Sequence, residues 1–285
     1  MLSFIAPVAL YLLLMFAYPV GYSLWLAFQS YDLKSLITGE SVYVELENFR
    51  TLVASADFSL AVRNTVVFTV ASIVVQYVIG LALALFFYRV FPLSRVSRAL
   101  MILPWLVPSI VATTSWRFMF AERGFLNQLL HVVGLGPVAW LTSPSTVLLS
   151  VIIVNIWVGI SFNLVLLHSG LQGIPVERYE AAQLDGAGAW KKLVYITLPA
   201  LRPVTAIILT LGFIYTLKQF DLIWTLTRGG PGNSSQLLST LAYQYAFVES
   251  SFGMGAAVNM ILFVVSGAAI VVYSIRQHRS SRGQQ

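Results

Sequence analysis

The feature that most constrains this chain is a series of long apolar stretches, each of them able to cross a lipid bilayer as a helix. They occupy residues 2–28, 61–88, 100–120, 146–171, 204–226 and 254–275. Because lipid offers the backbone no hydrogen-bond partner, such segments must be helical. The sequence therefore predicts an all-α integral membrane protein with six transmembrane helices and a single transmembrane domain over residues 1–285.

Composition supports this class of protein. Charged residues make up 10% of the 285 residues and apolar residues 58%, and the mean hydropathy is +0.81. An ordinary soluble domain has roughly 25% charged residues. Stretch 2–28 has no basic segment before it and no small-residue cleavage signal, so it is predicted to be a spanning helix. Pro104 and Pro108 lie within stretch 100–120, where neighbouring helices can satisfy the freed carbonyls.

Basic residues are concentrated on one side of the predicted membrane. That side holds Arg89, Arg95, Arg98, Arg178, Lys191, Lys192, Arg202, Arg276, Arg279 and Arg282. The opposite connections hold Asp32, Glu40, Glu45, Glu47, Asp57, Glu122 and Glu249, with fewer bases. The positive-inside rule makes the basic side cytoplasmic, so both termini are predicted to be cytoplasmic. Membrane orientation thus explains the net charge of +6. Nucleic acid is not an expected partner, because no basic cluster is interleaved with aromatic residues.

Residues 173–203 form the longest stretch of mixed polarity. Pro175 suits the first position of a helix, and Glu177 in the first turn suits the helix dipole. Gly186 is a natural helix end. A second short helix is predicted over 189–195, ended by the Leu198-Pro199 break. Two short helices joined by a turn should therefore project into the cytoplasm.

This segment resembles the EAA loop of the membrane subunits of ABC importers. The resemblance rests on Glu180, Ala181, Ala182, Asp185, Gly186 and Ala187, followed by Ile196-Thr197-Leu198-Pro199 and Pro203. It implies the type I ABC importer permease fold, with 173–203 as the coupling loop that docks into a cleft on an ATPase. The implied partners are a second permease subunit, homologous or identical, two ATPase subunits and an extracytoplasmic solute-binding protein. The implied location is the cytoplasmic membrane of a bacterium or archaeon.

The sequence carries no pattern typical of a catalytic site. It has no Walker phosphate-binding loop, no metalloprotease or serine-hydrolase motif and no cysteine, and its three histidines are scattered. The chain is therefore predicted not to be an enzyme and to bind no cofactor or metal. ATP and Mg²⁺ are expected to be used by the partner ATPase.

Polar residues within the apolar stretches form two stripes at helical spacing. Asn155, Gly159 and Asn163 share one face, as do Gly212, Tyr215, Thr216 and Gln219. Each side chain could simply bond a neighbouring helix, which contributes about 0.6–2 kcal/mol per contact. Taken as facing stripes, they predict a substrate path lined by Asn155, Gly159, Gly212, Tyr215, Thr216 and Gln219. The two glycines are expected to leave room for the ligand. Amide, hydroxyl and aromatic groups suit a neutral, hydroxyl-rich ligand such as a sugar.

The resemblance extends along the whole chain to carbohydrate-type permeases, similar to the maltose and glycerol-3-phosphate importer subunits. It rests on Asn155-Ile156-Trp157-Val158-Gly159, on Phe220 and on Leu226-Thr227-Arg228-Gly229-Gly230-Pro231. It implies ATP-driven uptake of a sugar or polyol. The alternative is a secondary transporter or channel driven by an ion gradient, which predicts inverted repeats and intramembrane carboxylates. Asp221 is the one candidate carboxylate. A membrane scaffold without transport would leave the polar stripes unexplained.

Overall fold

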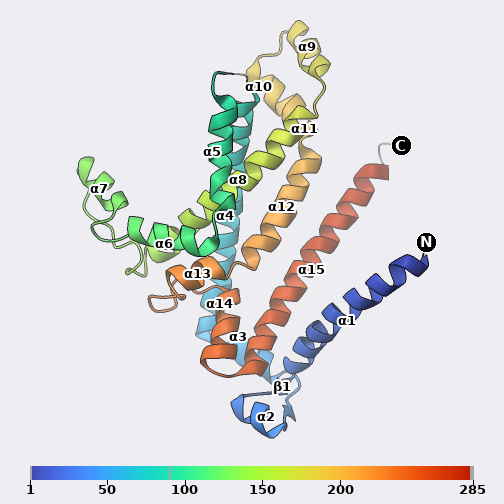
Figure 1. Cartoon of the computed structure of the whole chain (residues 1–285), viewed down its shortest axis with the longest axis vertical. Helices are drawn as coiled ribbons and strands as arrows, with labels where there is room; N and C mark the ends of the chain where they lie inside the picture. The colour runs from blue at the N-terminus through green and yellow to red at the C-terminus, as the bar shows by residue number, and fades with distance from the viewer. Residues whose placement is uncertain (1, 90, 283–285) are drawn as a thin grey trace. The chain divides into compact units, whose positions relative to one another are not determined.

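The computed structural model describes residues 2–89 and 91–282 (Figure 1). The predicted cytoplasmic ends at residues 1 and 283–285, like the side chains of Arg276, Arg279 and Arg282, lie outside the described part. The chain forms two compact units. Unit 1 comprises residues 1–65 and 236–268, and unit 2 comprises residues 66–235 and 269–285. The single domain over 1–285 stays a prediction.

Unit 1 contains two membrane helices and the connections that join them to the rest of the chain. Its elements are α1 (Leu2–Leu26), β1 (Gln29–Ser30), α2 (Leu33–Thr38), β2 (Val42–Tyr43), α3 (Glu47–Ala54), the first part of α4 (Ala56–Tyr88), α14 (Leu238–Tyr243), the π-helix η2 (Gln244–Val248) and the first part of α15 (Phe252–Arg282). β1 and β2 pair antiparallel. The buried Asn48 amide donates to the carbonyls of Ala27 (2.9 Å) and Gln29 (3.0 Å) and so fixes this hairpin to the end of α1.

Asp32 begins α2 as its N-cap residue. Its carboxylate accepts hydrogen bonds from the Ser35 amide (2.8 Å) and from the Ser35 hydroxyl (3.0 Å). These bonds, the backbone one foremost, hold the pKa of Asp32 below its ordinary value of 3.8. A lowered pKa means that the cap stabilises α2 above the ordinary pKa and is lost as pH falls through the folded-state pKa.

We therefore expect the hydrogen-exchange protection factor of the Ser35 amide to decrease as pH falls below 3.8. An Asp32→Asn variant retains a capping oxygen but does not titrate, so its protection factor should not change over this range. The measurement is amide exchange of the detergent-solubilised protein at a series of pH values. An equal pH response in the wild type and in Asp32→Asn would contradict the assignment.

Unit 2 contains the remaining membrane helices and the segment of mixed polarity. Its elements are the rest of α4, α5 (Ser94–Leu106), α6 (Ser109–Met119), α7 (Phe125–Val132), α8 (Val147–Gln172), α9 (Val176–Leu184), α10 (Ala189–Lys192), the π-helix η1 (Leu193–Thr197), α11 (Leu198–Ala200), α12 (Arg202–Leu217), α13 (Asp221–Leu226) and the end of α15. Leu164, Leu167, Leu171, Leu201 and Ile208 form part of its buried apolar core. α9 and α10 lie at one end, and α6, α7 and α13 lie away from them (Figure 1).

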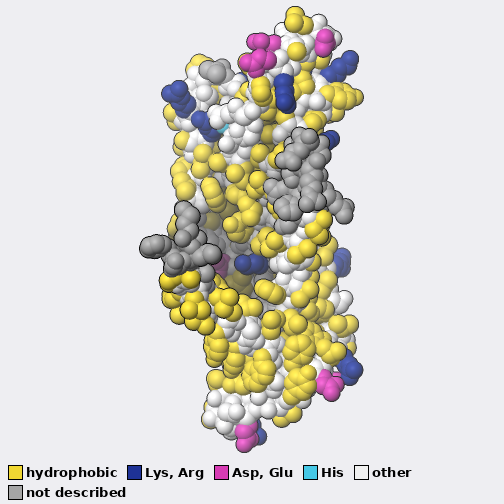
Figure 2. All heavy atoms as spheres, turned by 90° about the vertical axis from the view of Figure 1, so that its right-hand side faces the viewer, with side chains coloured by type: hydrophobic (Ala, Val, Ile, Leu, Met, Phe, Trp, Pro, Cys, Tyr) yellow, Lys and Arg dark blue, Asp and Glu magenta, His cyan; other side chains and the backbone are white. Residues whose placement is uncertain are grey.

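The six predicted membrane crossings correspond to four long helices and two bent helix pairs. α1, α4, α8 and α15 are each long and apolar enough to cross alone. The crossing predicted over 100–120 is not one straight helix, because α5 and α6 meet at 99°. Pro108 disfavours helical geometry at Val107, which is extended. The second pair, residues 189–200 and 202–217, is bent by 66°. Its second helix ends at Leu217 and α13 begins at Asp221, so the prediction of one helix over 204–226 is wrong. Hydrophobic side chains cover most of the face shown in Figure 2.

Candidate functional site

The coupling segment predicted over 173–203 begins with an exposed helix. Pro175 precedes α9, Glu177 lies in the first turn, and Asp185 ends the helix. Gly186 follows with φ +73°, a backbone conformation that residues with a Cβ rarely adopt. Its amide donates to the carbonyl of Gln183 (3.1 Å). The predicted helix, and the glycine that ends it, are confirmed.

The second helix is longer than predicted. The helical path continues from α10 through η1 and α11 as far as Ala200, so the predicted end at residue 195 is wrong. Pro199 lies at the start of α11, where its missing N–H is tolerated. Two contacts fix α9 to this path. The Tyr179 and Thr197 hydroxyls lie 2.9 Å apart, and the Lys192 ammonium donates to Gln183 Oε1 at 3.2 Å.

The six predicted coupling residues lie together on α9 and its following turn. Ala182 and Ala187 are half-buried, while Glu180, Ala181, Asp185 and Gly186 are exposed. A hollow of about 850 Å³ opens beside the helix, and its lining includes Ala181, Ala182 and Asp185. The small side chains thus border an open surface, as a docking helix requires.

Several exposed apolar residues of the same segment were not predicted as functional. Leu184 at the end of α9 is 91% exposed, and Trp190 and Tyr195 are exposed as well. Large apolar side chains on a surface mark interaction sites when they cluster. Their presence within the most polar segment of an apolar chain is the sequence signal that could have identified them.

The α8 stripe faces α4 at Gly159 and Asn163. The buried Gln76 amide of α4 donates to the backbone carbonyl of Asn155 (2.8 Å). A Cβ added at Gly159 would overlap the Gln76 amide, so the expectation that Gly159 leaves room for a ligand is wrong. Four residues further along each helix, a Cβ at Gly80 would lie 2.5 Å from Asn163 Cβ. The Gln76 side chain of α4 thus lies over Gly159 of α8, and the Asn163 side chain of α8 lies over Gly80 of α4.

The α12 stripe is arranged differently. Tyr215 is 63% exposed, and its ring contacts Phe162 of α8 edge-on, with 6.4 Å between centroids. Thr216 is buried. Gln219 is half-buried but lies beyond the end of α12 at Leu217, so the prediction that it shares one helical face with the other three residues is wrong. A Cβ at Gly212 would have one neighbour within 4 Å, Ile73 at 3.9 Å, so space remains there. The two stripes therefore do not face each other. The predicted path stays a prediction that rests on the α12 stripe.

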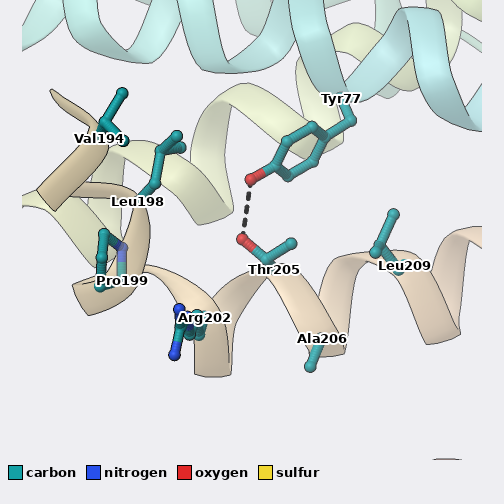
Figure 3. Close-up of a pocket in the computed structure, with 8 residues that line it drawn as sticks. All are labelled: Tyr77, Val194, Leu198, Pro199, Arg202, Thr205, Ala206 and Leu209. Atoms are coloured by element: carbon teal, nitrogen blue, oxygen red, sulfur yellow. Dashed lines mark hydrogen bonds between the residues drawn. The ribbon is translucent and has the colours of Figure 1, made fainter. Parts of the chain in front are cut away.

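A smaller hollow, of about 380 Å³, lies where α12 follows the coupling segment (Figure 3). The Tyr77 hydroxyl of α4 and the Thr205 hydroxyl of α12 lie 2.8 Å apart in it. Arg202 and Leu198 line the same hollow. This bond joins α4 to the first turns of α12. Within residues 2–89 and 91–282, no group of three His, Cys, Asp or Glu could hold a metal ion.

Comparison with known proteins gives concordant matches. Residues 76–282 match the family model described as binding-protein-dependent transport system inner membrane component. A trehalose/maltose transport system permease protein of Thermococcus litoralis is 34% identical over 82% of this chain and 79% of its own length. A trehalose transport system permease protein of Mycobacterium tuberculosis is 30% identical over 91% of this chain and 82% of its own length.

A likeness to a solved structure supports the fold. A chain of a bacterial alginate ABC transporter, solved in complex with an alginate pentasaccharide-bound periplasmic protein, superposes with a TM-score of 0.83. The match covers 97% of this chain and 93% of that chain at 23% identity. This likeness shows the predicted type I ABC importer permease fold.

Proposed function

Because this chain belongs to the family of binding-protein-dependent transport system inner membrane components, we propose that it forms half of the membrane pathway for uptake of a sugar or related polyol. It is an ABC importer permease and not an enzyme. The observation that carries the proposal is the exposed helix α9, which is fixed to a π-helical connection and followed by the Gly186 turn, at one end of an otherwise apolar helical unit. The names of the relatives, which refer to trehalose and maltose, support a sugar as the substrate class.

The other parts of the importer are assigned by the same reasoning. We propose that α9 docks on one of two separate ATPase subunits, which bind ATP and Mg²⁺, while this chain binds no cofactor or metal. A second permease subunit, homologous or identical, completes the pathway. An extracytoplasmic binding protein delivers the sugar from the opposite side. The permease lies in the cytoplasmic membrane with both termini in the cytoplasm, as the basic connections indicate.

A deletion strain that carries this permease on a plasmid tests the function. We expect it to accumulate at least one radiolabelled sugar from a panel of mono- and disaccharides. Accumulation should stop when the partner ATPase carries an inactivated Walker lysine. Accumulation that depended on an ion gradient and not on the ATPase would establish the secondary-transporter alternative. A panel in which no sugar is accumulated would contradict the proposed substrate class.

The α12 stripe gives a residue-level prediction for the same assay. Tyr215→Ala and Gln219→Ala should each reduce uptake severalfold or change the preferred sugar, because ring and amide contacts to the passing sugar would be lost. Ile207→Ala, which truncates another exposed side chain of α12, serves as the control. Copurification with the ATPase should be unchanged in all three. Unaltered uptake kinetics and sugar preference at normal expression would assign the stripe to helix packing.

A further inference from the structure

Unit 2 carries a third hollow, of about 690 Å³, at the end away from α9 (Figure 1). The residues that line it include Arg117, Phe120, Glu122, Trp140, Thr142 and Thr227. They come from the end of α6, the connections on either side of α7, and the end of α13. Its volume lies within the range of about 300–1,000 Å³ of pockets that hold small molecules.

One buried amide fixes two walls of this hollow. Asn127 of α7 donates through Nδ2 to the carbonyls of Glu122 (3.1 Å) and Val138 (3.0 Å). Its Oδ1 accepts from the Val138 amide (2.9 Å) and from Trp140 Nε1 (3.0 Å). The wall at Glu122 and the wall at Trp140 are therefore held at a set separation. The Trp140 indole is locked in orientation without any ligand.

Further contacts support the Trp140 ring and the wall opposite. Ser150 Oγ donates to the Trp140 carbonyl (2.8 Å), and the ring packs against Phe120 with 5.4 Å between centroids. Across the hollow, the Thr227 and Ser235 hydroxyls lie 2.8 Å apart, and Ser235 donates to the Gly230 carbonyl at 2.8 Å. The hollow is thus preformed, which reduces the entropic cost of binding.

Three polar side chains line the hollow together with the aromatic rings of Phe120 and Trp140. Arg117, Glu122 and Thr142 are exposed. In the described part of the chain, no hydrogen bond or ion pair engages these three side chains. A guanidinium, a carboxylate and a hydroxyl together offer donors and acceptors at several angles, as sugar hydroxyls require. An indole face contacts the apolar face of a sugar ring. A cation would be repelled by Arg117 and an anion by Glu122.

We propose that this hollow is a saccharide-binding vestibule, separate from the predicted path on α12, that holds the sugar before it enters the membrane. This inference rests on the proposed function, which places the end opposite α9 on the side from which the sugar arrives. Trp140 is the stacking surface, Arg117 and Glu122 are the polar contacts, and Asn127 is a positioning residue. Weak binding suits such a site, since the sugar must leave it again.

The test uses the assembled permease pair and ATPase in nanodiscs, without the binding protein. Radiolabelled maltose, trehalose and the sugar accumulated in the uptake assay are the probes, and binding is measured by equilibrium dialysis. We expect saturable binding of at least one probe. Trp140→Ala should weaken this binding about tenfold, in line with the loss of about 1.4 kcal/mol of ring contact. Trp140→Phe should weaken it less.

Surface variants make the test independent of folding. Arg117→Met and Glu122→Gln change exposed groups and should each weaken binding severalfold, whereas Trp25→Phe on α1 should have no effect. Asn127→Asp retains the acceptor for Trp140 but loses the Nδ2 donors. It should therefore weaken binding and also shift the emission of Trp140. The Trp140 emission is obtained by subtracting the fluorescence spectrum of Trp140→Phe from that of the protein with Trp140.

Two results would overturn the vestibule. One is a transporter that accumulates a sugar but shows no saturable binding of it, or binds it equally in the wild type and in Trp140→Ala. The proposed function would then stand, and only the vestibule would be contradicted. The other is weakened docking of the binding protein in Trp140→Ala with sugar binding unchanged, which would make the hollow a protein contact. Failure of uptake for every sugar is the separate result that contradicts the proposed function.

Discussion

Replacing Gly186 with tryptophan is expected to reduce uptake at least tenfold while the amount of folded permease in the membrane stays normal. A Cβ at Gly186 would have no heavy atom within 4 Å, so the chain itself has space for the new side chain. The positive φ of +73° adds a local strain of about 1–3 kcal/mol at an exposed turn. The indole would stand on the surface that we propose enters the ATPase cleft, and steric exclusion should reduce uptake at least tenfold.

Two variants separate this effect from backbone strain. Gly39→Trp is matched, because Gly39 has φ +75° and equally open surroundings at the end of α2. Gly186→Ala carries the strain without the bulk. Copurification of the ATPase and sugar-stimulated ATP hydrolysis are the measurements. Both should be lost in Gly186→Trp and kept in the other two. If Gly186→Trp retained the ATPase and its stimulation, the turn would not be the docking surface.

The second large effect is expected at the contact between α4 and α8. Gly80→Ala should lower the melting temperature strongly, because the added Cβ would lie 2.5 Å from Asn163 Cβ, an atom that no side-chain rotation can move away. Overpacking of this kind costs about 1–3 kcal/mol. The two helices would have to separate, and the Gln76 bond to the Asn155 carbonyl would be lost with them.

Gly267→Ala is the matched control, since Gly267 lies in α15 with no heavy atom within 4 Å of the added Cβ. The double variant Gly80→Ala/Asn163→Gly moves the missing Cβ to the other helix and should recover part of the stability. Fluorescence-detected size-exclusion chromatography after heating measures all four proteins. If Gly80→Ala melted like Gly267→Ala, the close approach of α4 and α8 would be contradicted.

Sequence reasoning predicted where most helices of this fold lie in the chain better than it predicted which helices pack against each other. Hydropathy located the membrane crossings, because a bilayer leaves the backbone few alternatives. The periodicity of Asn155, Gly159 and Asn163 established that they share a face. It could not establish which helix that face meets, because tertiary packing decides this. The structure places the stripe against Gln76, and the glycine predicted to leave a space is filled.

The first helix of the predicted coupling segment was the most predictable local feature, and the loop that forms the proposed vestibule was the least. Pro175, Glu177 and Gly186 determine local backbone geometry, so their positions alone predict the helix and its end. Asn127 carries no comparable signal. Its importance comes from contacts with residues up to thirteen positions away, which only the folded loop brings together. The angle between α5 and α6 is similar: Pro108 indicates a break but not a value of 99°.

The π-helical segment η1 makes the coupling segment sensitive to residue count as well as to residue identity. A π turn holds an additional residue compared with an α turn, and each residue advances a helix by about 100°. A further residue inserted into Leu193–Thr197, beyond the one that the π turn accommodates, would rotate α10 and the attached α9 by about 100° relative to α11. Every side chain of the EAA loop would remain, yet a different side of α9 would meet the partner. A series of one-residue insertions would therefore test whether the proposed docking depends on the orientation of α9, which single substitutions do not change.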